Sequence, residues 1–123
     1  MGKRILTEDG GNIAIIHSDE VLITDAQSAL DLIASLSWND DCDCMILNKE
    51  AISEAFFTLS NGIAGDVLQK FSNYRKKLAI IGDFSHYQSK PLKDYIYESN
   101  NGNCVFFVST EREAVEKLKL CQA

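Results

Sequence analysis

The sequence has little of several features that would place it in a specialised class. Its 123 residues include one proline and two histidines, and no apolar run approaches the ~18–20 residues that span a bilayer. The first residues also lack the apolar core of a signal peptide. Twelve basic residues stand against eighteen acidic ones, and a net charge of −6 argues against nucleic acid or an anionic membrane as a partner. We therefore expect a cytoplasmic protein with no nucleic-acid partner and no membrane partner.

The four cysteines do not have the spacing of a metal site. Cys42 and Cys44 form a C-x-C pair, whereas Cys104 and Cys121 stand alone. A zinc site needs a closely spaced pair together with a second cysteine or histidine pair, which this chain lacks. Residues two apart in a strand share a face, so we expect Cys42 and Cys44 to be small apolar fillers. The sequence predicts no metal and no cofactor.

Motifs of nucleotide binding and of common catalytic sites are also missing. There is no phosphate-binding loop, no dinucleotide fingerprint, no nucleophile elbow and no H-E-x-x-H. Asp83, Ser85 and His86 have the residue types of a hydrolytic triad, but they fall within four positions. Such triads are normally assembled from separated segments. We predict a non-enzymatic protein, with a small hydrolase as the least favoured alternative.

Composition and hydrophobic pattern predict one α/β domain over residues 1–123. With 46% hydrophobic and 24% charged residues, the chain has the composition of an ordinary globular protein. Two β-rich runs at 4–7 and 12–17 flank an acidic, glycine-containing turn, which predicts an N-terminal β-hairpin. Short apolar runs then predict strands at 42–47, 78–82 and 104–108. Helices between these strands make a mixed, mostly parallel sheet with helices packed on it.

Capping residues indicate where the helices begin. Capping-box patterns start helices at 24–27 and at 110–113, and Ser89 with Pro91 starts another. Ser60 is expected to be the N-cap of a helix that carries a stripe of apolar residues: Ile63, Ala64, Val67, Leu68 and Phe71. Asp66 and Lys70 should form an exposed pair on its other side. Residues 48–59 are ambiguous, and we expect a loop with a turn of helix.

The carboxyl ends of the parallel strands indicate where a ligand site would lie, and we call the residues around it the ligand rim. Ligands of open α/β sheets bind beyond these ends. The residues that follow the predicted strands there are Asn48 to Glu50, Asp83 to Tyr87, and Ser109 and Thr110. Among them we assign the rim to Asn48, Asp83, Ser85, His86 and Tyr87. Aromatic residues could line a pocket for a small molecule or a lipid: Phe56, Phe57, Phe84, Tyr87, Tyr95 and Tyr97.

The element order and the segment LSNGIAG at 59–65 together resemble the STAS (SpoIIAA-like) domain. This fold occurs in anti-sigma-factor antagonists and in the cytoplasmic domains of sulfate transporters. In the antagonists a D-S-S-G-L-G-type motif opens a helix, and a partner kinase phosphorylates its second serine to switch binding off. When the glycines are matched, Asn61 occupies the phosphorylated position and Ser60 the serine before it. A hydrophobic residue, Leu59, replaces the preceding acid.

The chain is more closely similar to a group of small bacterial proteins known as a domain of unknown function. The similarity runs through LSNGIAGDVLQKFSNYRKKLAIIGDF at 59–84 and LKDYIYESN at 92–100. The two resemblances together imply a regulatory module that binds another protein through Ser60, Asn61, Gly62 and Asp66. A small-molecule or lipid-binding protein is the alternative. Homodimerisation through an edge strand or a helix face is also open.

Overall fold

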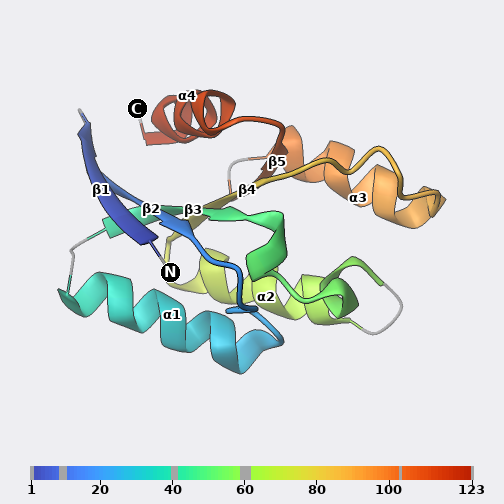
Figure 1. Cartoon of the computed structure of the whole chain (residues 1–123), viewed down its shortest axis with the longest axis horizontal. Helices are drawn as coiled ribbons and strands as arrows, with labels where there is room; N and C mark the ends of the chain where they lie inside the picture. The colour runs from blue at the N-terminus through green and yellow to red at the C-terminus, as the bar shows by residue number, and fades with distance from the viewer. Residues whose placement is uncertain (1, 9–10, 40–41, 59–61, 103, 123) are drawn as a thin grey trace.

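The computed structural model describes residues 2–8, 11–39, 42–58, 62–102 and 104–122 (Figure 1). Five strands form one sheet: β1 (Gly2–Glu8), β2 (Gly11–His17), β3 (Cys42–Asn48), β4 (Lys77–Ile81) and β5 (Val105–Val108). The α-helices between and after them are α1 (Ala26–Asn39), α2 (Ile63–Asn73), α3 (Lys90–Asn100) and α4 (Glu111–Gln122). The expected α/β class, with an N-terminal hairpin and then alternating elements, is confirmed. No helix formed by these residues is long and apolar enough to cross a membrane.

The strands lie in the sheet in chain order, from β1 at one edge to β5 at the other. The first pair is antiparallel, with Gly11 opposite Glu8, and the remaining three pairs are parallel. Parallel neighbours cannot be joined by a tight turn, so a helix crosses over between each pair. Right-handed crossovers that always step in the same direction put their helices on the same face of the sheet.

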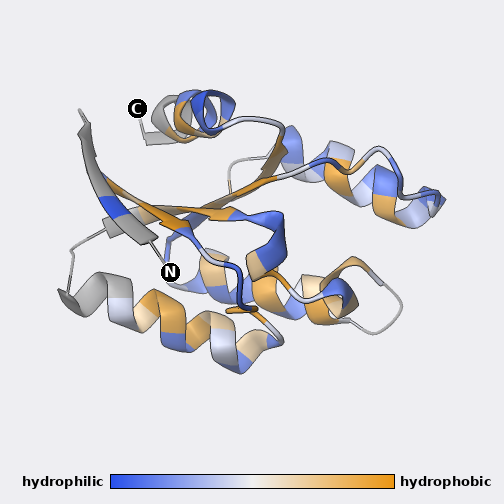
Figure 2. Ribbon diagram, viewed as in Figure 1, coloured by the Kyte–Doolittle hydropathy of each residue, from blue (hydrophilic) through white to orange (hydrophobic). Residues whose placement is uncertain are grey.

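The two faces of the sheet are covered unequally. One face packs against α1, α2 and α3 through a core that includes Ile33, Phe71 and Leu92. The other face packs against α4 through Ala114 and Leu118. Figure 1 shows α1 and α2 together on one side of the strands and α4 on the opposite side. Figure 2 shows hydrophobic colour along the central strands and alternating colours on these helices.

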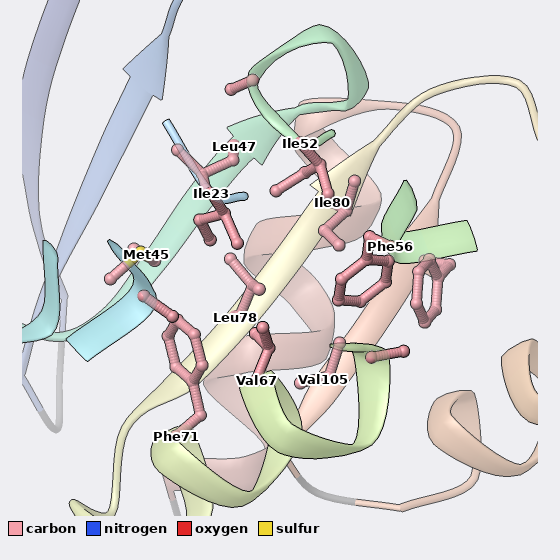
Figure 3. Packing of buried hydrophobic residues seen from close by; sticks show 14 of the residues in the cluster. Ile23, Met45, Leu47, Ile52, Phe56, Val67, Phe71, Leu78, Ile80 and Val105 are labelled. Carbon is pink, nitrogen blue, oxygen red and sulfur yellow. The ribbon is translucent and has the colours of Figure 1, made fainter. Parts of the chain in front are cut away.

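The larger core is dense at its centre. Phe71 of α2 is fully buried and lies below Met45 and Leu78 of the neighbouring strands, while Phe56 lies beside Ile80 (Figure 3). The expected stripe on α2 is therefore correct, since Ala64, Val67 and Phe71 are buried and Ile63 and Leu68 pack against the core. Burying a side chain of this size typically contributes about 1.5–3 kcal/mol, so this face supplies much of the driving force for folding.

Three helices begin with the side-chain caps that the sequence predicts, and at one of them the cap lies one residue later than expected. The Ser89 hydroxyl accepts from Leu92 N–H at 3.4 Å, and Thr110 Oγ1 accepts from Glu113 N–H at 3.1 Å. At α1 the box lies one residue later than expected. Asp25 Oδ1 accepts from Ser28 N–H at 2.9 Å, and Ser28 Oγ accepts from Asp25 N–H at 3.1 Å. A serine can replace the usual glutamate because its hydroxyl can both donate and accept.

The start of α2 corrects the sequence-based expectation. The helix begins at Ile63, and its N-cap is Gly62, not Ser60. Gly62 has φ of +80° and ψ of −3°, the left-handed region, and makes no side-chain cap bond. A residue without Cβ adopts this conformation at little cost, so the glycine sets the helix start two residues after Ser60. Ser60 and Asn61 themselves lie outside the described residues.

The other expectation for α2 was an ion pair on its outer side. Asp66 is exposed and Lys70 is half-buried. Among the ion pairs between described residues, none joins Asp66 to Lys70. The segment after β3 agrees better with the sequence, because two short 3₁₀ turns, Lys49–Ala51 and Glu54–Phe57, lie within the ambiguous stretch.

The end of α2 forms a Schellman motif around a residue with positive φ. Lys76 N–H donates to Phe71 O at 2.8 Å and Arg75 N–H to Ser72 O at 3.1 Å. Arg75, with φ of 56°, occupies the position that glycine usually takes in this motif. A side chain in this conformation costs about 1–2 kcal/mol.

We predict that Arg75→Gly stabilises the protein. The gain should be about 0.5–1 kcal/mol, because glycine removes the left-handed strain but adds about 0.5–1 kcal/mol of backbone entropy to the unfolded chain. Urea denaturation monitored by circular dichroism measures the change. Arg75→Ala is the control, since it removes the same charge and keeps Cβ; an equal gain in both variants would show that strain is not the cause.

Candidate functional site

A cavity of about 610 Å³ lies at the carboxyl ends of β2, β3 and β4. This edge is where the sequence placed the ligand rim. Ile15, Ile46 and Ile81 form an apolar floor from three adjacent strands. They belong to the sheet face that carries α4, where Ile15 and Ile46 are buried and Ile81 is half-buried. Ligand pockets are commonly about 300–1,000 Å³ and mostly apolar, so this cavity has the size and lining of one.

The polar rim of the cavity comes from five different elements: β1, β2, β3, the 3₁₀ turn after β3, and α4. Arg4 of β1 pairs with Ile15 across the hairpin, so its side chain lies on the cavity face. Arg4 Nη2 donates to Glu111 Oε1 on the first turn of α4, which links the first strand to the last helix. His17 and Glu50, both exposed, complete the lining. The carboxyl-edge rule placed Glu50 at this edge, whereas Arg4, His17 and Glu111 were not assigned to it from the sequence.

Asn48 lies at the rim, as expected, but its side chain is already engaged. Its Oδ1 accepts from Ser18 N–H at 2.9 Å and its Nδ2 donates to Ser18 O at 2.7 Å. Both residues are buried, at 8% and 2% exposed. The amide therefore pairs with two backbone groups. If these groups were buried without a partner, each would destabilise the fold by about 1–3 kcal/mol. Asn48 holds the end of β2 against β3, and this determines the position of the cavity wall.

Tyr87 belongs to a cluster beneath the same edge. Its hydroxyl donates to Glu54 Oε2 at 3.0 Å, and Lys49 Nζ contacts Glu54 Oε1 at 2.9 Å. Lys49 Nζ also lies 5.1 Å from the centroid of the Tyr87 ring and 5.4 Å from that of Phe57. The two rings are stacked, with centroids 5.1 Å apart. The cluster joins the segment after β3 to the segment after β4.

The pKa shifts in this cluster arise from hydrogen bonding and from burial. The hydrogen bond from Lys49 lowers the pKa of Glu54. Burial acts to lower the pKa of Lys49, but its contacts with Tyr87 and Glu54 outweigh burial and the pKa is raised. Burial raises the pKa of Tyr87. Near neutral pH the cluster therefore has a charged lysine, a charged glutamate and a neutral tyrosine, which is the arrangement that its hydrogen bonds require.

Asp83 and Ser85 bond to each other and not to His86. Asp83 Oδ1 accepts from the Ser85 hydroxyl at 2.6 Å and from Ser85 N–H at 2.9 Å, and these bonds lower the pKa of Asp83. The His86 ring lies against Tyr87, with centroids 4.2 Å apart. A hydrolytic triad places the histidine between the serine and the acid. The hydrogen bonds among these three described residues do not have that order.

A second cavity, of about 550 Å³, lies beside the first, at the ends of β4 and β5. Asp83, Ser85 and Ser109 contribute its polar lining, and Phe84 and Phe107 contribute apolar surface. The structure thus divides the expected rim: Asn48 lines the first cavity, Asp83 and Ser85 line the second, and His86 and Tyr87 line neither. Of the expected interaction residues, Gly62 and Asp66 are exposed on α2, away from both linings.

Gly82 lies where the two cavities meet and is included in both linings. A Cβ at this position would lie 2.7 Å from Lys49 Cβ and 3.0 Å from Lys49 Cδ. This separation is too short for two carbon atoms, so glycine allows Lys49 to pass close to β4 and reach Glu54. No local pattern predicts this contact, because nothing in the neighbouring residues distinguishes Gly82 from a strand-ending glycine.

Comparison with known proteins gives a family but no activity. A family profile described as a domain of unknown function (DUF4180) matches residues 8–118. This confirms the expectation of an uncharacterised small domain, whereas the STAS resemblance stays a prediction. No curated protein and no solved structure matches the chain.

We predict that Gly82→Ala destabilises the protein by about 1–3 kcal/mol, the usual cost of an added methyl group in a packed site. The added Cβ would force Lys49 away from β4 and loosen the cluster with Glu54 and Tyr87. Chemical denaturation of the variant and of two double variants tests this in a mutant cycle. Lys49→Gly should relieve the penalty, and Lys49→Ala should not, since alanine keeps the clashing Cβ. Equal relief by both would contradict the contact.

Proposed function

The chain belongs to the DUF4180 family, and for this member we propose the binding of a small organic molecule in the cavity over β2, β3 and β4. The observation that carries the proposal is the cavity of about 610 Å³ with its floor of three isoleucines and its polar rim. It lies at the carboxyl ends of parallel strands, where open α/β sheets bind ligands. The apolar floor would take the body of the molecule, and the rim would fix its orientation.

The surroundings of the cavity favour binding without a reaction. Asn48 is engaged with the Ser18 backbone, and Asp83 is engaged with Ser85. Nucleophilic catalysis requires a nucleophile within reach of a base. The Ser85 hydroxyl and the Asp83 carboxylate are such a pair, but they line the second cavity and not the one over β2, β3 and β4. A rigid edge with satisfied polar groups is suited to hold a ligand in one orientation. We therefore propose a non-enzymatic binding protein, and a small hydrolase remains the weaker alternative.

A second proposed function is the regulatory interaction module implied by the STAS resemblance. The supporting observation is the start of α2, where exposed Gly62 supplies no side-chain cap and exposed Asp66 follows in the first turn. A helix N-terminus favours negative charge, so an acidic or phosphorylated group there would be tolerated. The proposed partner is another protein. A homodimer would be a separate outcome.

We expect a bulky residue at the mouth of the cavity to block small-molecule binding. His17→Trp introduces such a residue into the lining, whereas His86→Trp places the same residue outside it. Cyclohexylmethanol, a neutral probe, is titrated while amide shifts are followed by NMR. Saturable shifts should centre on Ile15, Ile46 and Ile81, should weaken by about tenfold or more in His17→Trp (over 1.4 kcal/mol), and should persist in His86→Trp. Absence of saturable shifts there in the wild type would contradict the proposal.

For the interaction module, Ser60→Asp should change partner binding by adding a negative charge before α2. Ser72→Asp is the matched control, because it adds the same charge to an exposed position at the other end of this helix. Tagged wild type and both variants are used for affinity capture from native lysate, with mass spectrometry of bound proteins. A protein lost only in Ser60→Asp supports the module. The same set of proteins in all three samples counts against this surface.

A further inference from the structure

The charges that line the cavity do not cancel. One basic and two acidic residues line it, together with one histidine: Arg4, Glu50, Glu111 and His17. With histidine counted as neutral, the lining has a net charge of −1. The whole chain has the same sign, at −6. A cavity with an apolar floor and one excess negative charge differs from an anion site, in which basic groups dominate.

The positive groups at the cavity are already matched. Arg4 is bonded to Glu111, whose side chain is 45% exposed. The N-terminus of α4, which carries a partial positive charge, has Glu111 and Glu113 in its first turn. Thr110 also accepts one of the first N–H groups of this helix. An anionic ligand would therefore have to displace Glu111 from Arg4 before it met an unmatched positive charge.

Glu50 is the acidic residue of the lining that is in none of the ion pairs between described residues. It lies on the 3₁₀ turn directly after β3 and lines the cavity together with the Arg4–Glu111 pair. Its Oε1 accepts from Asn48 Nδ2 at 3.4 Å, a long hydrogen bond from a neutral group. Asn48 is itself fixed by Ser18, so it helps to hold the Glu50 carboxylate at the rim.

We infer that the ligand of this cavity is a singly charged organic cation: an amine with an apolar body. The body lies on Ile15, Ile46 and Ile81, and the ammonium group is paired with Glu50. This inference rests on the proposed small-molecule function and adds the ligand class and a specificity-determining residue. A neutral molecule of the same shape would use the floor and leave Glu50 unpaired, so it would bind more weakly. An anion would be repelled by Glu50 and would bind most weakly.

Three probes that share one body separate charge from shape. Cyclohexylmethylamine, cyclohexylmethanol and cyclohexanecarboxylate are each titrated at pH 8 and low salt, with dissociation constants measured from NMR amide shifts. An ion pair at a partly exposed site contributes little, so the amine should bind about 1.4- to fivefold more tightly than the alcohol. The carboxylate should bind more weakly than the alcohol. Raising the salt concentration should reduce these differences and leave alcohol binding unchanged.

Glu50→Gln tests the assigned residue. It should remove the preference for the amine, so that the amine and cyclohexylmethanol bind this variant with equal affinity. Glu113→Gln is the control, because it removes a carboxylate from the first turn of α4 that does not line the cavity. The inference is overturned, and the proposed function kept, if the alcohol binds but the amine has no advantage or keeps it in Glu50→Gln. If none of the three probes gives saturable shifts at the cavity, both the function and the inference fail.

Discussion

The parallel order of β2, β3, β4 and β5 is the constraint on which the rest of the structure depends. Because each strand lies beside its predecessor, every crossover steps in the same direction, and α1, α2 and α3 all lie on one face. The opposite face is left to α4 alone. A helix is about 10–12 Å wide, whereas five strands spaced about 4.8 Å apart are roughly twice as wide. One helix cannot cover this face, and the cavity lies where the cover ends.

The same constraint brings the polar groups together at one edge. Parallel strands all end at the carboxyl edge, so the segments after β2, β3 and β4 become neighbours although they are far apart in sequence. Each of these segments is held by a contact to another. Asn48 bonds the Ser18 backbone, Lys49 and Tyr87 share Glu54, and Gly82 gives Lys49 the space to pass. The edge is therefore a connected set of contacts, and a change at one member should reach the others.

The features that the sequence predicted well are those set by local patterns. Strand and helix positions, the caps at Ser89 and Thr110 and the apolar stripe of α2 depend on residues a few positions apart. The carboxyl-edge rule also indicated where Asn48 and Asp83 would lie. Contacts between distant segments had no local signal, and the pair of Arg4 with Glu111 joins residues 107 positions apart. At α2 two nearby residues each predict a helix start. The N-cap is the left-handed Gly62 and not the serine at 60.

The polar groups at the carboxyl edge are held by fixed partners. At this edge Asn48 is committed to the backbone, Asp83 is bonded to Ser85, and Glu54 is shared by Lys49 and Tyr87. These partners make the walls rigid, which lowers the entropy lost when a ligand binds. Glu50, whose only described polar partner is the Asn48 amide, is the lining acid that remains available to recognise a charge.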